Sequence, residues 1–204
     1  MSETCKELEA KFYLVDLAGL QKTLERLSAA LVQPRTYERN LRFDTPDGFL
    51  TQSAQVLRLR KDTANRLTYK GPGEVQEGVS MRTEIEFTVG SFENAQKLLE
   101  ALGYQVSMIY EKNRTVYDLN GVFVTLDEMP FGNFAEIEGV DGASIRAVCE
   151  QIGLMWKLRT LQSYAQLFQV VKQNLGLTLR DLTFRNFAEI KVGPRHLELA
   201  PADW

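Results

Sequence analysis

The stretch Glu7-Leu8-Glu9-Ala10-Lys11, followed by Phe12, carries a charged side chain at every second position. On a β-strand this spacing projects Glu7, Glu9 and Lys11 from one face and the apolar residues between them from the other. Two carboxylates and an ammonium group, backed by apolar residues, suit a strand whose charged face lines an enclosed polar cavity rather than facing open solvent. The stretch therefore predicts a strand with a charged interior face and a buried exterior face.

The same spacing of charges returns at three later points in the chain, at Arg58/Arg60, Glu84/Glu86 and Glu136/Glu138. Segments of alternating polar and apolar residues around these pairs predict roughly eight strands. The predicted strands are 6–15, 35–44, 55–61, 66–70, 79–89, 104–118, 122–127 and 134–138. The dipeptide Asn120-Gly121 is a strong signal for a tight hairpin turn. The predicted helices are 17–31, a short helix or loop at 49–53, 91–102, 141–151 and 161–173. Residues 71–78, between two predicted strands, are expected to form a loop.

Strands that are charged on one face and apolar on the other constrain how the sheet can be arranged. Closing the sheet on itself removes its open edges and encloses the charged faces. The apolar faces then need the helices as cover. The sequence therefore predicts an α+β fold, a closed eight-stranded antiparallel β-barrel with helices packed on the outside.

The composition excludes several classes of protein. The chain has 204 residues, of which 25% are charged, and a net charge of −3, which argues against general nucleic-acid binding. No apolar run approaches the roughly 20 residues of a membrane span, and Met1-Ser2-Glu3 lacks the basic start of a secretory signal. Cys5 and Cys149 are too few for a disulfide scaffold or a zinc cluster. We expect a cytoplasmic protein with reduced thiols, no nucleic-acid or membrane partner, and either a monomeric or a homodimeric state.

A cavity lined by both signs of charge points to a particular kind of ligand. Mg²⁺ takes carboxylate oxygens together with substrate phosphates, and Arg and Lys bind phosphate oxygens. Packed carboxylates repel one another without a cation, and packed cations repel without an anion. The mixture therefore predicts a polyphosphate bound with a metal ion. The acidic candidates are Glu7, Glu9, Glu84, Glu86, Asp127, Glu136 and Glu138, and the basic candidates are Lys11, Arg58, Arg60, Lys70 and Arg114.

The ordered series of these motifs resembles the CYTH superfamily, also called triphosphate tunnel metalloenzymes. Glu7-x-Glu9-x-Lys11 is similar to the ExExK signature of that family, and the resemblance covers residues 6–164. The later motifs that carry it are Phe43-Asp44-Thr45-Pro46, Leu57-Arg58-Leu59-Arg60, Thr68-Tyr69-Lys70-Gly71-Pro72, Arg82-Thr83-Glu84-Ile85-Glu86, Glu111-Lys112-Asn113-Arg114, Leu126-Asp127-Glu128, Gly132 to Gly139 and Ser163-Tyr164. Each motif alone is weak, but the complete ordered set is a strong signal.

The resemblance implies a tunnel that binds a triphosphate-containing small molecule and uses Mg²⁺ or Mn²⁺. The tunnel domain would span residues 1–175, followed by an extension of unknown role at 176–204. The resemblance assigns metal ligation to Glu7, Glu9, Asp127, Glu136 and Glu138, with Glu84 and Glu86 beside them. It assigns the binding of phosphate oxygens to Lys11, Arg58, Arg60, Lys70 and Arg114.

The family includes thiamine triphosphatases, inorganic tripolyphosphatases, RNA 5′-triphosphatases and class IV adenylate cyclases. We expect hydrolysis of the terminal phosphoanhydride of inorganic tripolyphosphate or of an organic triphosphate such as thiamine triphosphate. Water would attack the terminal phosphorus in line with the leaving pyrophosphate. Lys11 and Lys70 would orient this water or help to deprotonate it, since a buried lysine flanked by cations can have a lowered pKa.

Two alternatives stay open. Class IV adenylate cyclases, which make cyclic AMP from ATP, often carry a His-Phe pair just before ExExK, and its absence before Glu7 favours hydrolysis. A non-catalytic polyphosphate-binding module is the second alternative, since Gln162 stands where many relatives have a basic residue. The retained Lys11 and the full acidic set argue against this module.

Several other charged residues carry weaker expectations. Lys61, Lys112 and Arg159 are predicted to be surface charges, and His196 to be incidental. Relatives often have Gln-x-Asp-x-Tyr where this chain has Glu38, Asn40 and Arg42. The sequence leaves open whether Arg35, Arg39 or Arg42 faces the tunnel.

Overall fold

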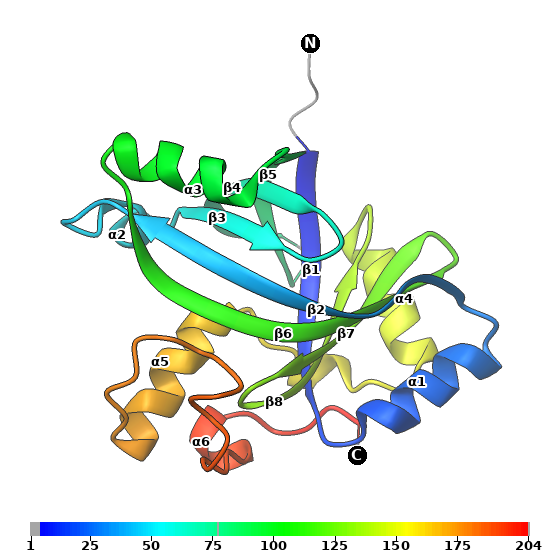
Figure 1. The fold of residues 1–204 in the computed structure, drawn as a ribbon. Coiled ribbons are helices and arrows are strands. Elements are labelled where there is room, and N and C mark those ends of the chain that lie inside the picture. Colours follow the sequence, from blue (N-terminus) through cyan, green and yellow to red (C-terminus); the bar gives the residue numbers. More distant parts are fainter. Residues whose placement is uncertain (1–4, 77, 204) are drawn as a thin grey trace.

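The computed structural model describes residues 5–76 and 78–203, without the side chains of Cys5 and Lys6 (Figure 1). Met1-Ser2-Glu3, on which the expectation of no secretory signal rests, lies outside the described residues. The described strands are β1 Cys5–Leu14, β2 Ala30–Asp44, β3 Val56–Lys61, β4 Asn65–Gln76, β5 Val79–Thr88, β6 Gln105–Leu119, β7 Val122–Met129 and β8 Gly132–Glu138. The helices are α1 Leu17–Arg26, α2 Phe49–Gln52, α3 Phe92–Ala101, α4 Gly142–Gln151, the 3₁₀ turn η1 Trp156–Leu158, α5 Tyr164–Leu175 and α6 Pro194–Leu197.

The strands form a closed barrel in the order β1-β5-β4-β3-β2-β6-β7-β8, which confirms the predicted fold. Every neighbouring pair is antiparallel, and β1 closes the ring by pairing with β5 over Cys5–Glu9 and with β8 over Glu9–Leu14. The long strands β2 and β6 run side by side along the barrel wall (Figure 1). Their pairing is interrupted by three register shifts, and such bulges bend a strand and help it to curve around a barrel.

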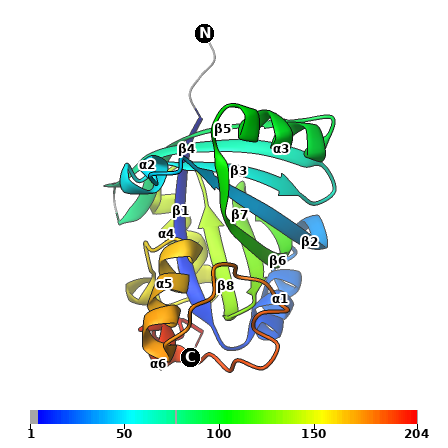
Figure 2. The ribbon, with the colours of Figure 1, turned by 60° about the vertical axis from the view of Figure 1, so that its left-hand side comes forward.

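Apolar clusters fill the space between the barrel and its helices. Phe12 and Ile137 point outward from β1 and β8 and are completely buried in one cluster with Leu24 of α1. At the other end of the molecule, Phe92 of α3 packs in a cluster with Leu59 of β3 (Figures 1 and 2). The outward residues of the strands therefore supply the hydrophobic core, which leaves the inward positions to charged side chains.

Two segments differ from their sequence predictions. The helix expected over 17–31 ends at Arg26, and the chain reverses at Ser28, whose φ is +58°, to begin β2 at Ala30. The sequence prediction rested on leucines at helical spacing, which run from Leu17 to Leu31. Ala30, however, pairs with Asp118 of β6, so the chain forms a strand there instead. The loop expected over 71–78 instead belongs largely to β4, which pairs with β5 beyond a register shift between Lys70 and Gly73. Glu77 of that loop lies outside the described residues.

The described part of the C-terminal tail packs onto the barrel, beginning where α5 ends at Leu175 and Gly176 takes a φ of +63°. Leu182 pairs with β6, since its N–H donates to Ile109 O at 2.9 Å. Further along, Ala202 N–H donates to Tyr13 O of β1 at 2.9 Å. α5, α6 and the tail lie together at the end of the molecule opposite α3 (Figure 2).

Two further sequence expectations concern membranes and thiols. In the described part of the chain, no helix combines the length and the apolar run that a membrane crossing requires. Cys149 is a buried free cysteine, and burial raises the pKa of its thiol to about 12.

Candidate functional site

The inward faces of the strands enclose a cavity of about 490 Å³. Charged side chains dominate its lining, which also includes Val56, Tyr110 and the first residues of α5. All the predicted site residues line the cavity except Asp127. The carboxylates on the wall are Glu7, Glu9, Glu84, Glu86, Glu136 and Glu138, and the cations are Lys11, Arg42, Arg58, Arg60, Lys70, Arg82, Lys112 and Arg114.

One wall of the cavity is acidic and is built from β1, β5 and β8. Glu7 and Glu84 both contact Lys70, whose Nζ lies 2.7 Å from Glu7 Oε1 and 3.3 Å from Glu84 Oε2. Glu138 is exposed as a residue, but the partial burial of its carboxyl group and the charges of Glu7 and Glu9 raise its pKa to about 7. Burial and the neighbouring carboxylates Glu136 and Glu7 also raise the pKa of Glu9. This wall carries more negative charge than its lysines neutralise.

The acidic wall suits a hard divalent cation by its donor chemistry. Mg²⁺ and Mn²⁺ take carboxylate oxygens, and a cation would relieve the repulsion that, after burial, raises the pKa of Glu9 and Glu138. Within residues 5–76 and 78–203, however, no three acidic, histidine or cysteine side chains are gathered closely enough to form a ready-made metal site. The donors therefore fit the ion, and binding it requires their side chains to turn toward one another.

The opposite part of the cavity is basic and begins on β3. Arg58 Nη2 and Arg60 Nη2 lie 3.3 Å and 3.1 Å from the carboxylate of Glu86. Glu86 also accepts a hydrogen bond from Thr68 Oγ1 at 2.7 Å. Burial opposes ionisation of Glu86, but Arg60 and these hydrogen bonds lower its pKa overall. The structure thus places Glu86 among the arginines, away from Glu7 and Glu9.

Asp127 does not line the cavity and is completely buried. Its Oδ2 atom accepts from Lys112 Nζ at 3.0 Å and from the Tyr164 hydroxyl at 2.7 Å, and its Oδ1 atom accepts from Arg114 Nε at 2.7 Å. Glu136 contacts Arg114 and lies 2.9 Å from Lys11. Both carboxylates therefore hold cavity cations in place.

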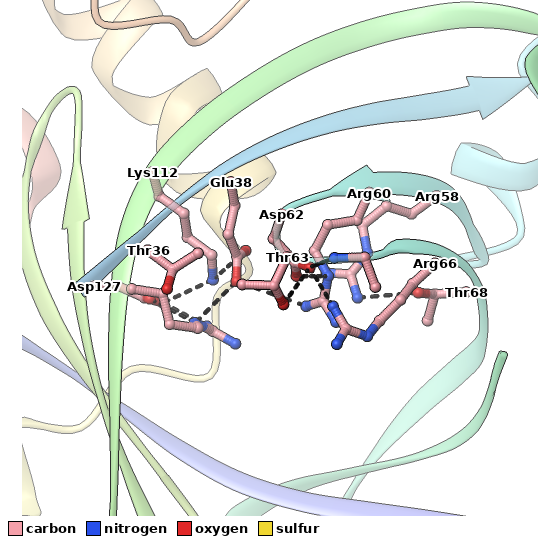
Figure 3. Close-up of polar contacts among 12 residues, drawn as sticks. Thr36, Glu38, Arg58, Arg60, Asp62, Thr63, Arg66, Thr68, Lys112 and Asp127 are labelled. Carbon is pink, nitrogen blue, oxygen red and sulfur yellow. Dashed lines mark hydrogen bonds and ion pairs between the residues drawn. The ribbon is translucent and has the colours of Figure 1, made fainter. Parts of the chain in front are cut away.

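Lys112 corrects a sequence prediction, because it is not a surface charge. Its side chain is 3% exposed and projects into the barrel from β6 with Tyr110 and Arg114. The two-residue spacing from Arg114 was the signal that could have identified it. Glu38 faces Lys112 across the register and lies 3.7 Å from its Nζ (Figure 3). Glu38 is buried, and Lys112 and Arg114 lower its pKa although burial opposes this.

The structure also gives the positions of the remaining charged residues. Lys61 is a surface charge, as predicted, with a side chain 56% exposed. Arg159 is half-buried, lying over the Trp156 ring at 4.5 Å. Arg42 lines the cavity, whereas Arg35 forms an exposed ion pair with Glu128 and Arg39 does not reach the cavity.

The two lysines expected to act on water are surrounded by carboxylates. Burial lowers the pKa of Lys11, but Glu136 and Glu9 raise it above its usual value. Burial likewise opposes protonation of Lys70, and Glu7 and Glu9 raise its pKa. The expectation of a lowered lysine pKa is therefore not met, because carboxylates lie closer to both amines than the arginines do. Both lysines are ammonium groups at neutral pH.

Tyr164 is a site residue to which the sequence assigned no role. It is the first residue of α5, whose start at Ser163 is fixed by a capping box with Gln166. Its ring lies 4.7 Å from Lys11 Nζ and 5.5 Å from Lys112 Nζ. The ring face attracts both ammonium groups, so α5 positions two cavity lysines.

Comparisons with known proteins agree with this geometry. The CYTH domain family matches residues 6–146, and no curated protein matches significantly. A candidate adenylate cyclase from Vibrio parahaemolyticus has a TM-score of 0.72 and 23% identity over 80% of this chain and 97% of its own. The PH1012 protein from Pyrococcus horikoshii has a TM-score of 0.66 and 26% identity over 78% and 96%. A candidate adenylyl cyclase from Hippeastrum, described as revealing a dominant triphosphatase activity, has a TM-score of 0.62 and 23% identity over 95% and 100%.

Proposed function

Because the chain belongs to the CYTH family, we propose that it is a divalent-metal-dependent triphosphatase. The observation that supports the proposal most directly is the meeting of an acidic wall and a basic wall in one cavity. Inorganic tripolyphosphate, or an organic triphosphate such as thiamine triphosphate, is the proposed substrate. The solved relative from Hippeastrum, with its described triphosphatase activity, is in line with this choice.

We propose that the metal ion, Mg²⁺ or Mn²⁺, is held by the acidic wall of Glu7, Glu9, Glu84 and Glu138. When bound, the ion would supply positive charge that stabilises the phosphoryl oxygens. Glu7 and Glu84 share the single cation Lys70. By contrast, Glu86, Glu136 and Asp127, which the resemblance also named as ligands, each lie within ion-pair distance of at least two cations. Their proposed role is to hold those cations at fixed positions.

The cations of the basic wall would bind the phosphate chain. Arg58, Arg60 and Arg114 offer planar guanidinium groups to phosphate oxygens. Lys112 adds a buried ammonium group beside Arg114. These groups are fixed before substrate arrives, so they stabilise the charge of the transition state without further reorganisation.

The water that attacks the terminal phosphorus would be oriented by Lys11 and Lys70. Each ammonium group is held by a carboxylate, since Lys11 contacts Glu136 and Lys70 contacts Glu7. Attack forms a bond from the water oxygen to the terminal phosphorus and breaks the anhydride bond to the leaving pyrophosphate. Because both lysines are protonated, their proposed contribution is positioning and charge neutralisation rather than removal of the water proton.

The cavity favours hydrolysis over cyclisation. A cyclase must also hold an adenine and a ribose, which calls for an apolar or aromatic slot. Among the described residues, the aromatic rings of the lining are Tyr110 and Tyr164. The Tyr110 hydroxyl accepts from Arg58 at 3.2 Å, and the Tyr164 ring lies against two lysines.

The experiment is a product assay with Mg²⁺ or Mn²⁺ and tripolyphosphate, thiamine triphosphate or ATP. We expect metal-dependent release of phosphate, reduced roughly a hundredfold in Arg58→Ala because a preorganised charge is lost. Lys61→Ala, which removes an exposed cation, is the matched control and should keep full activity. Cyclic AMP as the main product would favour the cyclase, and tight binding without turnover under either metal would favour the non-catalytic module.

A further inference from the structure

Two arginines of the cavity wall, Arg42 on β2 and Arg82 on β5, differ from the other cations there. The six remaining lysines and arginines each lie within ion-pair distance of a carboxylate. Among the described residues, neither Arg42 nor Arg82 has such a partner, nor a hydrogen bond from its guanidinium. The Nε atom of Arg82 is buried without a partner in that part of the chain.

The acidic group nearest to Arg42 along its strand is already committed elsewhere. Asp44 accepts from the N–H groups of Leu50 and Thr51 at 2.8 Å and 3.1 Å and from the Thr51 hydroxyl at 2.6 Å. These bonds tie Asp44 to α2. Burial lowers the pKa of Arg42, Tyr110 and Asp44 oppose this, and the charges of Arg82 and Arg58 lower the pKa further. The two guanidinium groups therefore add to each other's positive charge.

The chain leaves space for the guanidinium of Arg82. Arg82 pairs with Gly73 of β4, and a Cβ at that glycine would lie 2.9 Å from Arg82 Nη2. The glycine sits just beyond the register shift that follows Lys70. The register shift and the absence of a side chain at Gly73 thus leave room for Arg82 to lie against β4 on the cavity side.

We propose that Arg42 and Arg82 bind one further phosphate group, so that the protein accepts linear inorganic polyphosphates with more than three phosphates. A half-buried cation without a partner is costly unless a ligand supplies the opposite charge. Two guanidinium groups match the oxygens of a phosphate. This inference rests on the proposed function, because it extends the same phosphate chain.

The register of the strands places this subsite in line with the others. Arg42 pairs with Arg58, which is one of the proposed phosphate-binding residues. Arg82 lies two residues beyond Glu84, the partner of Lys70, and hence about 7 Å further along the strand. A chain held by Arg58 and Lys70 would therefore reach the two arginines with its next phosphate.

The test compares tripolyphosphate with tetrapolyphosphate for the wild type, Arg42→Gln and Arg82→Gln, in the presence of Mg²⁺. We expect each substitution to lower kcat/KM for tetrapolyphosphate about tenfold more than for tripolyphosphate, because a charged contact to the fourth phosphate is lost. Arg35→Gln, which removes an exposed arginine outside the cavity, should leave the ratio unchanged. Calorimetric binding of both polyphosphates provides a second measurement that does not depend on turnover.

The possible outcomes separate this inference from the proposed function. An unchanged tetrapolyphosphate to tripolyphosphate ratio in both variants, for kcat/KM and for affinity, would overturn the fourth-phosphate site while leaving the triphosphatase intact. Absence of turnover for either polyphosphate would contradict the proposed function. In that case a selective loss of tetrapolyphosphate affinity in the two variants would still support the site.

Discussion

At the scale of single residues, Asp127 shows how the tunnel holds its cations. The carboxylate is completely buried and accepts from Lys112, Arg114 and Tyr164. Removing one member of a buried charged network leaves the others without compensation. Asp127 therefore matters for stability before any ligand binds.

Asp127→Asn is expected to destabilise the metal-free protein by about 3–5 kcal/mol, which corresponds to a fall in Tm of roughly 6–20 °C for a chain of this size. Thermal denaturation without metal is the measurement. Glu128→Gln is the matched control, since the adjacent Glu128 pairs with Arg35 at the surface and should cost less than about 1 kcal/mol. Equal, small shifts in both variants, with metal affinity lost only in Asp127→Asn, would make Asp127 a metal ligand instead.

Glu138 gives the acidic wall a dependence on pH. Its pKa in the folded protein, about 7, lies above the ordinary value of 4.5. Between these two values the folded state holds more protons than the unfolded state, so stability falls as the pH rises through this window. Glu138→Gln should flatten the fall in Tm between pH 5 and pH 8 in metal-free buffer. If the Tm of the variant falls as steeply with pH as that of the wild type, the carboxyl group of Glu138 is not the source of the repulsion in the acidic wall.

At the scale of elements, α5 connects the outer shell of the molecule to the cavity. Ser163 caps the helix by accepting from Gln166 N–H at 3.3 Å, and the next residue is Tyr164. The cap thus fixes the ring that lies against Lys11 and Lys112. On the same principle, Ser91 caps α3 by accepting from Asn94 N–H at 3.2 Å, at the end of the molecule opposite α5 (Figures 1 and 2).

This pair of caps allows a matched experiment. Ser163→Ala and Ser91→Ala should each cost about 1 kcal/mol, or roughly 2–4 °C in Tm. Only Ser163→Ala should also lower kcat, because the start of α5 positions the lysines. Thermal denaturation and the phosphate-release assay measure the two effects. Equal kcat values in the two variants would show that the start of α5 does not affect the reaction.

The elements also show what the sequence could predict. Charges at two-residue spacing identified β1, β3, β5 and β8 and the face that each turns inward, because a strand alternates strictly. The end of α1 was missed, since the leucine pattern continued beyond Arg26 and the partner of Ala30 lies far away on β6. Lys112 was predicted to be a surface charge, although its two-residue spacing from Arg114 puts both side chains on one face of β6. The burial of Asp127 depends on Tyr164, a contact between distant segments that no local pattern reveals.

At the scale of the whole molecule, the two charged walls should respond to ligands together. The metal would reduce repulsion in the acidic wall, and the phosphate chain would do so in the basic wall. A ligand at a hundred times its Kd stabilises a protein by about 2.7 kcal/mol, which is roughly 5–10 °C in Tm here. Tripolyphosphate with Mg²⁺ should therefore raise Tm by more than the sum of the two separate shifts. Strictly additive shifts would indicate two independent sites.

The most direct measurement of the central claim is a crystal structure with Mn²⁺ and tripolyphosphate, using the anomalous signal of manganese. We expect one phosphate chain inside the barrel, with its oxygens on Arg58 and Arg60. The manganese peak should lie between that chain and the carboxylates of Glu7 and Glu9. Phosphate or manganese bound only on the outer surface, with the cavity filled by water, would contradict the account.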